Sequence, residues 1–187
     1  MIGKKNIVFG FLYLVLTAAL GPYMVKGIFP ELEKAGSARQ EQMAQLQLMA
    51  GSDFEQDLEP LAAGDIARRN TTALLALNGQ LQTLDRLDSI KGGPHAHGNL
   101  EALLNIAAGL VLCFLALGRG FKQLLSWAFL LGALLHSGML YLGIVFEQSW
   151  AMQLLGLGIG PILLLVALLL TGAGAAIGFR GELVRDD

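Results

Sequence analysis

Long apolar stretches that carry almost no charge limit what this chain can fold into. The charged residues are concentrated in 26–91, and the stretches outside that segment contain few of them. Hydrophobic residues make up 54% of the 187-residue chain and charged residues only 15%, with a mean hydropathy of +0.57. A soluble domain of this size has too little interior to bury so much apolar surface. The pattern therefore predicts an integral membrane protein.

Four stretches are long enough to cross a hydrocarbon core, which takes about 20 residues of α-helix. We predict membrane spans at 6–25, 99–117, 124–146 and 151–179. The predicted fold class is all-α: a four-helix integral membrane bundle with an extramembrane helical insertion between spans one and two. The predicted divisions are the first transmembrane helix, the extracytoplasmic helical segment, the three-helix series of spans and a cytoplasmic tail: 1–25, 26–96, 97–179 and 180–187.

Basic residues indicate the orientation of these spans. They lie before span one, between spans two and three, and after span four: Lys4, Lys5, Arg119, Lys122, Arg180 and Arg185. By the positive-inside rule, both termini are predicted to be cytoplasmic, in the inner membrane of a bacterium, with the lipid bilayer as the first partner. The formal net charge of −2 and the absence of a sustained basic run argue against nucleic acid as a partner.

The segment between spans one and two is rich in helix-forming residues. Strong helix formers fill 37–49, and leucines recur at spacings of three and four along 70–90. Glycine and proline interrupt the segment at 51–52, at Pro60 and at 92–94. We therefore expect two or three extramembrane helices here, packed on the bundle or on another subunit.

Ionisable and amide side chains are crowded at the start of span two. An ionisable group inside lipid costs several kcal/mol, so such groups are the first candidates for function. The candidates are His95, His97, Asn99, Glu101 and Asn105. Three of them, His97, Glu101 and Asn105, recur at a spacing of four and share one helix face, which should meet protein rather than lipid.

Span three carries one further histidine, His136, on a face with Gly132, Met139 and Gly143. We expect this face to meet the polar face of span two. Measured from the outer ends of the spans, His97 and His136 should differ in depth by about 12–15 Å, so they are not expected to bind one iron together. His136 is therefore interpreted as a deeper second site, or as a polar anchor bonded to Asn105.

The start of span two also carries a family resemblance. His-Ala-His-Gly-Asn-Leu at 95–100, followed by Leu-Leu-Asn at 103–105, resembles the histidine helix of small four-span membrane proteins of the styrene oxide isomerase and hydroxylaminobenzene mutase type. The first six residues are also similar to helices of haem-copper oxidase catalytic subunits. The first resemblance implies an oligomer that binds b-type haem through His97 or His95, and an isomerase or redox-related function.

Three functional hypotheses follow. The first is a haem b bound through His97 or His136, with Glu101 and Asn105 as candidate catalytic residues. The second is a zinc, copper or iron ion held at the outer mouth by His95, His97 and Glu101, because imidazole and carboxylate at i and i+4 can share a metal. The third is a non-catalytic accessory subunit of a membrane complex, in which the polar face serves only helix packing.

Small residues in span four bear on assembly. Gly-x-x-x-Gly motifs at 156–160 and 174–178 allow close helix approach, and two such faces exceed what one chain needs for its own core. They predict a homo-oligomer or a membrane partner subunit. Pro161 is expected to kink this span. Cys113 is the single cysteine, so no intramolecular disulfide can form.

Overall fold

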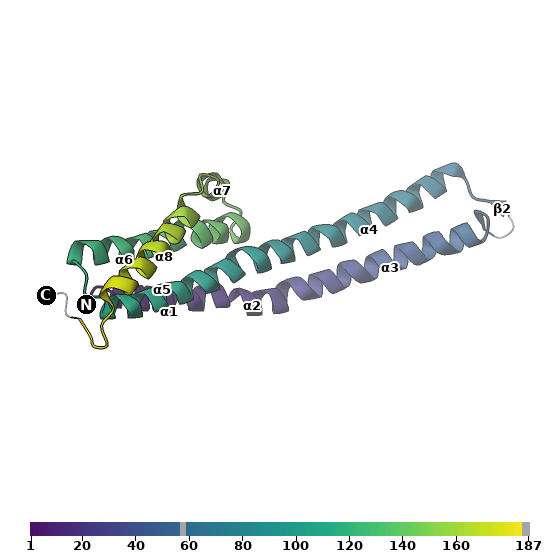
Figure 1. Cartoon of the computed structure of the whole chain (residues 1–187). Helices are drawn as coiled ribbons and strands as arrows, with labels where there is room; N and C mark the ends of the chain where they lie inside the picture. Colours follow the sequence, from purple (N-terminus) through teal and green to yellow (C-terminus); the bar gives the residue numbers. More distant parts are fainter. Residues whose placement is uncertain (57–58, 185–187) are drawn as a thin grey trace. The chain divides into compact units, whose positions relative to one another are not determined.

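The structure, a computed structural model, describes residues 1–56 and 59–184. The described chain is almost entirely helical, which confirms the all-α class, and it divides into two compact units (Figure 1). One unit comprises Met1–Gly21 and Ser89–Asp187, and the other comprises Pro22–Asp88. Residues 185–187 of the predicted tail, including Arg185, lie outside the described residues.

Four helices are long and apolar enough to cross a membrane, as predicted. Their helical stretches are Lys4–Gly51, Ala63–Phe114, Arg119–Val145 and Ile159–Gly178. Two of these stretches are far longer than a bilayer requires, because the helix does not end where span one was predicted to end or where span two was predicted to begin.

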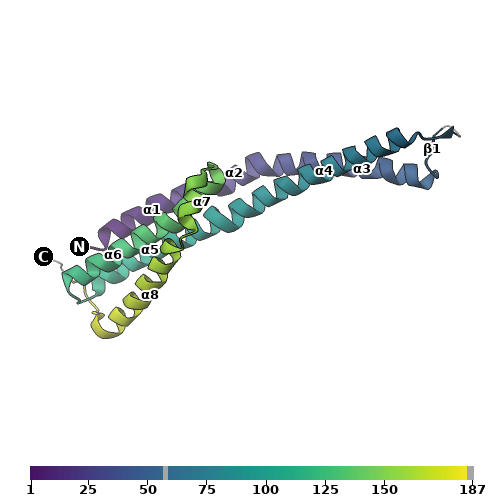
Figure 2. The same ribbon diagram turned by 90° about the horizontal axis from the view of Figure 1, so that it is seen from above.

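The first unit is a set of helices in which each packs against its neighbours. They are α1 (Lys4–Ala18), α5 (Ala96–Phe114), α6 (Arg119–Ala133), α7 (Ser149–Leu155) and α8 (Ile159–Gly178). Helix α5 packs against both α1 and α6, and α8 packs against α6 (Figures 1 and 2). A short helix, α2 (Leu20–Tyr23), follows α1 in the chain.

Glycines bring α1 and α5 into backbone contact. A Cβ on Gly10 would lie 2.6 Å from the carbonyl oxygen of Ala102, and a Cβ on Gly109 would lie 2.7 Å from that of Gly3. Gly98 is likewise covered by the side chain of Thr17. Close approach of this kind is how membrane helices gain packing energy without a hydrophobic driving force between them.

π-Helical turns interrupt the regular helices at four places among the described residues. They are η1 (Met24–Ile28), η2 (Lys91–His95), η3 (Leu134–Gly138) and η4 (Tyr141–Val145). The predicted break at 92–94 is a kink rather than an end, since only Gly93 leaves helical geometry there, at ψ −106°. The helix therefore continues through Pro94 into α5.

Span four differs from its prediction. It is not one helix over 151–179 but two, α7 and α8, separated by a turn in which Gly158 takes a φ of +69°. The expected kink at Pro161 is wrong, because Pro161 lies in the first turn of α8, where a missing N–H removes no helical hydrogen bond. The left-handed turn at Gly158 redirects the chain instead.

The glycines of span four pack within the chain. A Cβ on Gly160 would lie 2.6 Å from the backbone nitrogen of His136, and Cβ atoms on Gly174 and Gly178 would meet Leu117 at 2.8 and 3.0 Å. Three of the four motif glycines are therefore used by the chain's own core, whereas Gly156 meets only backbone of the preceding turn. The sequence argument for an oligomer loses most of that support, and the oligomer stays a prediction.

The second unit is a helical hairpin formed by α3 (Phe29–Gly51) and α4 (Ala63–Ile90). Residue pairs β1 (Glu55–Gln56) and β2 (Glu59–Pro60) form a minimal antiparallel ladder near its tip, and Asp53 and Phe54 take positive φ just after α3. Within this unit, Arg86 of α4 donates to the hydroxyl of Tyr23, the last residue of α2, at 2.8 Å. The predicted insertion thus contains two long helices.

Candidate metal centre

A buried carboxylate, Glu101 on α5, is the centre of the polar cluster in the first unit. It is 3% exposed, and the Nδ1–H of His136 donates to its Oε1 at 2.5 Å. A carboxylate this deeply buried is costly unless it is paired and hydrogen-bonded. The predicted meeting of the two polar faces is confirmed at this pair, although Gly132 of the predicted face packs on Leu164 of α8.

The second oxygen of Glu101 is fixed by the residue after His136. The Oγ of Ser137 donates to Oε2 at 2.5 Å, and the backbone N–H of Ser137 donates to the same atom at 3.3 Å. The hydroxyl of Tyr13, on α1, donates in turn to Ser137 Oγ at 2.8 Å. Since His136 and Ser137 both lie in η3, its wider turn aims two successive residues at one carboxylate.

His97 completes the cluster, one turn before Glu101 on α5. Its ring lies 4.8 Å from the ring of His136, centroid to centroid, at an interplanar angle of 64°. One ligand-type atom from each of His97, Glu101 and His136 lies within 4.8 Å of the others. The expected difference in depth between His97 and His136 is therefore wrong: the two rings are level and in contact.

The donor set suits a transition-metal ion. Imidazole nitrogens and carboxylate oxygens are ligands that zinc, copper and iron accept, and a site built on two imidazoles leaves positions open for water or substrate. The Nδ1 of His136 faces Glu101, which leaves its Nε2 as the nitrogen for a metal. A carboxylate that orients a ligating histidine in this way is the usual support of a metal site, and Ser137 holds that carboxylate in turn.

His95, one of the three metal ligands predicted at the outer mouth, lies apart from this cluster. Its Nδ1 is 3.1 Å from the carbonyl oxygen of Thr17. The hydroxyl of Thr17 donates to Asn99 Oδ1 at 2.7 Å, so α1 and α5 are tied together there. Among the described residues, the group of candidate ligands is His97, Glu101 and His136, so His136 takes the place that the sequence analysis gave to His95.

Asn105, predicted as a candidate catalytic residue or as the partner of His136, is fully buried one turn below Glu101. Its amide nitrogen donates to the carbonyl oxygens of Glu101 and Phe129 at 3.0 and 3.3 Å. Its Oδ1 accepts from the amide of Asn6 at 3.0 Å, and Asn6 also bonds Ser126. The predicted bond between His136 and Asn105 is wrong, because Glu101 takes His136.

Sequence reasoning missed Tyr13 and Ser137. A usable signal existed for Tyr13, because Asn6, Tyr13 and Thr17 are polar residues in an apolar span, at spacings of seven and four that place them on one face. All three are buried. Ser137 gave a weaker signal, since regular helical geometry would point it about 100° away from His136.

The cluster therefore has fixed geometry on three sides. Both oxygens of Glu101 accept hydrogen bonds, one nitrogen of His136 is oriented by Glu101, and the exposed ring of His97 contacts the ring of His136.

No protein-family model, no curated protein and no solved structure matches this chain.

Proposed function

We propose that this chain is a small integral membrane metalloprotein that binds one divalent transition-metal ion between His97, Glu101 and His136. The observation that carries the proposal is the convergence of these three side chains within 4.8 Å, on helices long and apolar enough to cross a membrane. Ionisable groups at such positions rarely serve packing alone. When bound, the ion would supply an electrophilic centre with open coordination positions.

The chain's own residues have distinct parts in this site. His97 and His136 supply the nitrogen donors, and Glu101 orients His136 through the bond between Nδ1 and Oε1. Ser137 and Tyr13 hold Glu101 through a continuous hydrogen-bond chain. Such outer partners are typically worth a factor of about 10–100 in metal affinity.

The ring contact bears on the haem alternative. With the rings 4.8 Å apart, no porphyrin plane fits between His97 and His136. A haem b would have to be bound by a single histidine, as the resemblance to the styrene oxide isomerase and hydroxylaminobenzene mutase type implies. The geometry supports a non-haem ion better, and the haem-binding isomerase or redox-related function remains the second candidate. The accessory-subunit role is the outcome if neither group binds.

The orientation and location belong to the same proposal. The starts of α1 and α6 and the end of α8 carry Lys4, Lys5, Arg119 and Arg180, which supports cytoplasmic termini in an inner membrane. The α3–α4 hairpin would then lie outside the cytoplasm.

Metal analysis of the purified protein tests the site. The wild type, purified in mild detergent with zinc, copper or iron, should retain metal in proportion to protein and show no Soret band. Substitutions His97→Ala, His136→Ala and Glu101→Gln should remove most of it. His95→Ala is the matched control, because the chain has three histidines and this one lies outside the cluster. Equal metal in all four variants would overturn the proposal, and a Soret band lost with His97 would establish haem instead.

A further inference from the structure

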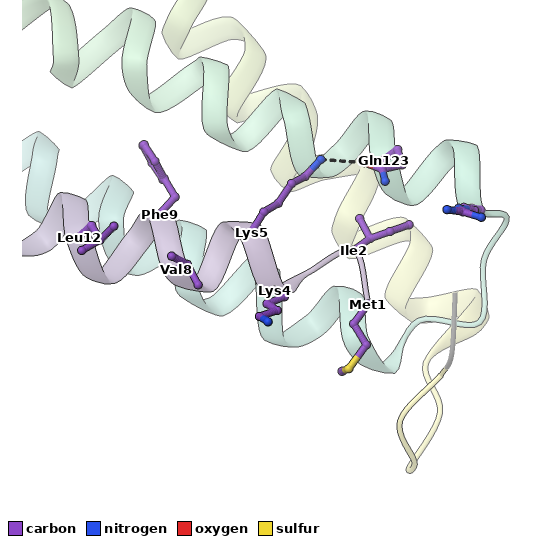
Figure 3. Close-up of a pocket in the computed structure, with 9 residues that line it drawn as sticks. Met1, Ile2, Lys4, Lys5, Val8, Phe9, Leu12 and Gln123 are labelled. Atoms are coloured by element: carbon purple, nitrogen blue, oxygen red, sulfur yellow. Dashed lines mark hydrogen bonds between the residues drawn. The ribbon is translucent and has the colours of Figure 1, made fainter. Parts of the chain in front are cut away.

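A groove opens on the first unit between the start of α1 and the start of α6, at the end opposite the η3 turn along α6. Its volume is about 680 Å³ (Figure 3). Three basic side chains line it, Lys4, Lys5 and Arg119. Its apolar wall is formed by Val8, Phe9 and Leu12, which follow along α1 in Figure 3. The groove does not overlap the metal cluster.

The charge of this groove is unbalanced. Among the described residues, no acidic residue lines the groove, and neither α1 nor α6 has an acidic residue in its first turn. Cations at helix N-termini are unfavourable, because the helix dipole places positive charge there too. Two helix starts and three basic side chains on one groove together attract an anion.

Lys5 is already positioned at the edge of the groove. Its Nζ donates to Gln123 Oε1 of α6 at 2.7 Å, as Figure 3 shows, and lies 4.2 Å from the centroid of the Trp127 ring. An ammonium group has three hydrogens, so this bond leaves others for an anionic oxygen. The side chain is thus partly ordered before any ligand binds, which lowers the entropic cost of binding.

The apolar wall distinguishes a lipid from a free anion. Val8 and Leu12 are 49% and 69% exposed, and they continue from the basic residues into the most apolar part of α1. An inorganic phosphate would use the basic residues and leave this wall bare. A phospholipid uses both, with its phosphate at the cations and an acyl chain along the wall.

We infer that this groove binds an anionic phospholipid, with the phosphate group between Lys4, Lys5 and Arg119 and one acyl chain against Val8, Phe9 and Leu12. Each basic residue near an anionic surface adds to the electrostatic attraction. The inference is independent of the metal site, because none of its residues contacts that cluster.

Reconstitution in nanodiscs tests the inference. The full chain is placed in phosphatidylcholine alone or with phosphatidylglycerol, and native mass spectrometry counts the lipids retained while fluorescence follows thermal unfolding. Phosphatidylglycerol should be retained preferentially and should raise the unfolding midpoint. The variant Lys4→Gln/Lys5→Gln/Arg119→Gln should lose both effects, measured against its own unfolding midpoint in phosphatidylcholine, because it also loses the Lys5 contacts with Gln123 and Trp127. Arg180→Gln, an exposed cation outside the groove, should keep them.

Two further arms separate the sources of the anion. Inorganic phosphate added to phosphatidylcholine nanodiscs should not raise the midpoint, and short-chain phosphatidylglycerol should raise it less than the long-chain lipid. Equal stabilisation by inorganic phosphate would overturn the lipid assignment. Equal retention of phosphatidylglycerol by the wild type and the triple variant would overturn the groove as the binding site. If the triple variant does not fold, Arg119→Gln alone is compared with Arg180→Gln in the same two measurements.

Discussion

The ring of His97 on α5 and the ring of His136 on η3 lie level with each other, 4.8 Å apart. The reason is the turn that joins the two helices. His97 precedes the end of α5 at Phe114 by 17 residues, and His136 follows the start of α6 at Arg119 by 17 residues. In an antiparallel pair with a short connection, residues equally far from the turn stand opposite each other. The cluster is therefore a property of one helical hairpin.

Removing the Ser137 hydroxyl should destabilise the protein. In Ser137→Ala, Glu101 loses a 2.5 Å hydrogen bond and the Tyr13 hydroxyl loses its acceptor. Leaving buried polar groups unpaired costs about 1–3 kcal/mol. The change in unfolding free energy in detergent measures this. Thr171→Val is the matched control, because among the described residues the Thr171 hydroxyl is buried without a hydrogen-bond partner, and its loss should be neutral or stabilising.

Asn6 and Asn105 should behave as a coupled pair. Each single leucine substitution leaves the partner amide buried with an unmade hydrogen bond, at a cost of about 1–3 kcal/mol. The double variant Asn6→Leu/Asn105→Leu removes both amides of the 3.0 Å pair and should cost less than the sum of the two single variants. A double-mutant cycle of unfolding free energies gives the coupling. Strict additivity would mean that the amides act separately.

Gly10→Ala should weaken the contact between α1 and α5. The added methyl would lie 2.6 Å from the carbonyl oxygen of Ala102, so the helices must move apart, and overpacking of this kind costs about 1–3 kcal/mol. Gly172→Ala on α8 meets no atom within 4 Å and should be neutral or slightly stabilising. Thermal unfolding of the two variants side by side makes the comparison. A smaller loss of thermal stability in Gly10→Ala than in Gly172→Ala would show that α1 and α5 are packed less closely than described.

Cysteine labelling should report the proposed orientation. In a Cys113→Ser background, a cysteine at Ser52 should react with an impermeant reagent in intact cells, and one at Gly120 should react only after the membrane is opened. Both positions are exposed, whereas Cys113 is buried. The reverse pattern would place the hairpin in the cytoplasm.

Metal removal should lower the thermal unfolding midpoint only in proteins that keep the His97, Glu101 and His136 cluster. A ligand that binds only the folded state stabilises it by about 2.7 kcal/mol at 100 times its dissociation constant. A chelator should therefore lower the unfolding midpoint of the wild type and of His95→Ala, and should leave that of His97→Ala unchanged. A chelator effect of the same size in His97→Ala would place any bound metal elsewhere.

Much of the fold can be predicted because a chain that spans lipid must satisfy its backbone hydrogen bonds internally. Backbone groups in hydrocarbon must bond within the helix, so an apolar stretch of sufficient length specifies its own secondary structure. The division between α7 and α8 escaped this reasoning, since the residues around Gly158 are as apolar as their neighbours and only the positive φ marks the turn. Hydropathy does not report backbone direction.

The part of the candidate site on α5 could be predicted from helical spacing, and the part on η3 could not. Helical spacing placed His97, Glu101 and Asn105 on one face, and Glu101 and Asn105 are indeed buried. The predicted depth of His136 was wrong because it was measured from the outer ends of the spans, and the helix of span two extends far beyond its predicted outer end, whereas that of span three ends at Val145. Ser137 could not be found by periodicity, since η3 departs from the regular 3.6-residue turn at that point.

The bonding of Glu101 also constrains how the protein can be made. Among the described residues, the side-chain donors to its two oxygens lie on η3, which is synthesised only after α5, the connecting turn and α6. A carboxylate entering hydrocarbon without those donors faces a barrier of several kcal/mol. In the proposed membrane-spanning arrangement, α5 and α6 should insert together as a hairpin. Burial of α5 then requires translation up to Ser137, more than twenty residues after α5 ends at Phe114.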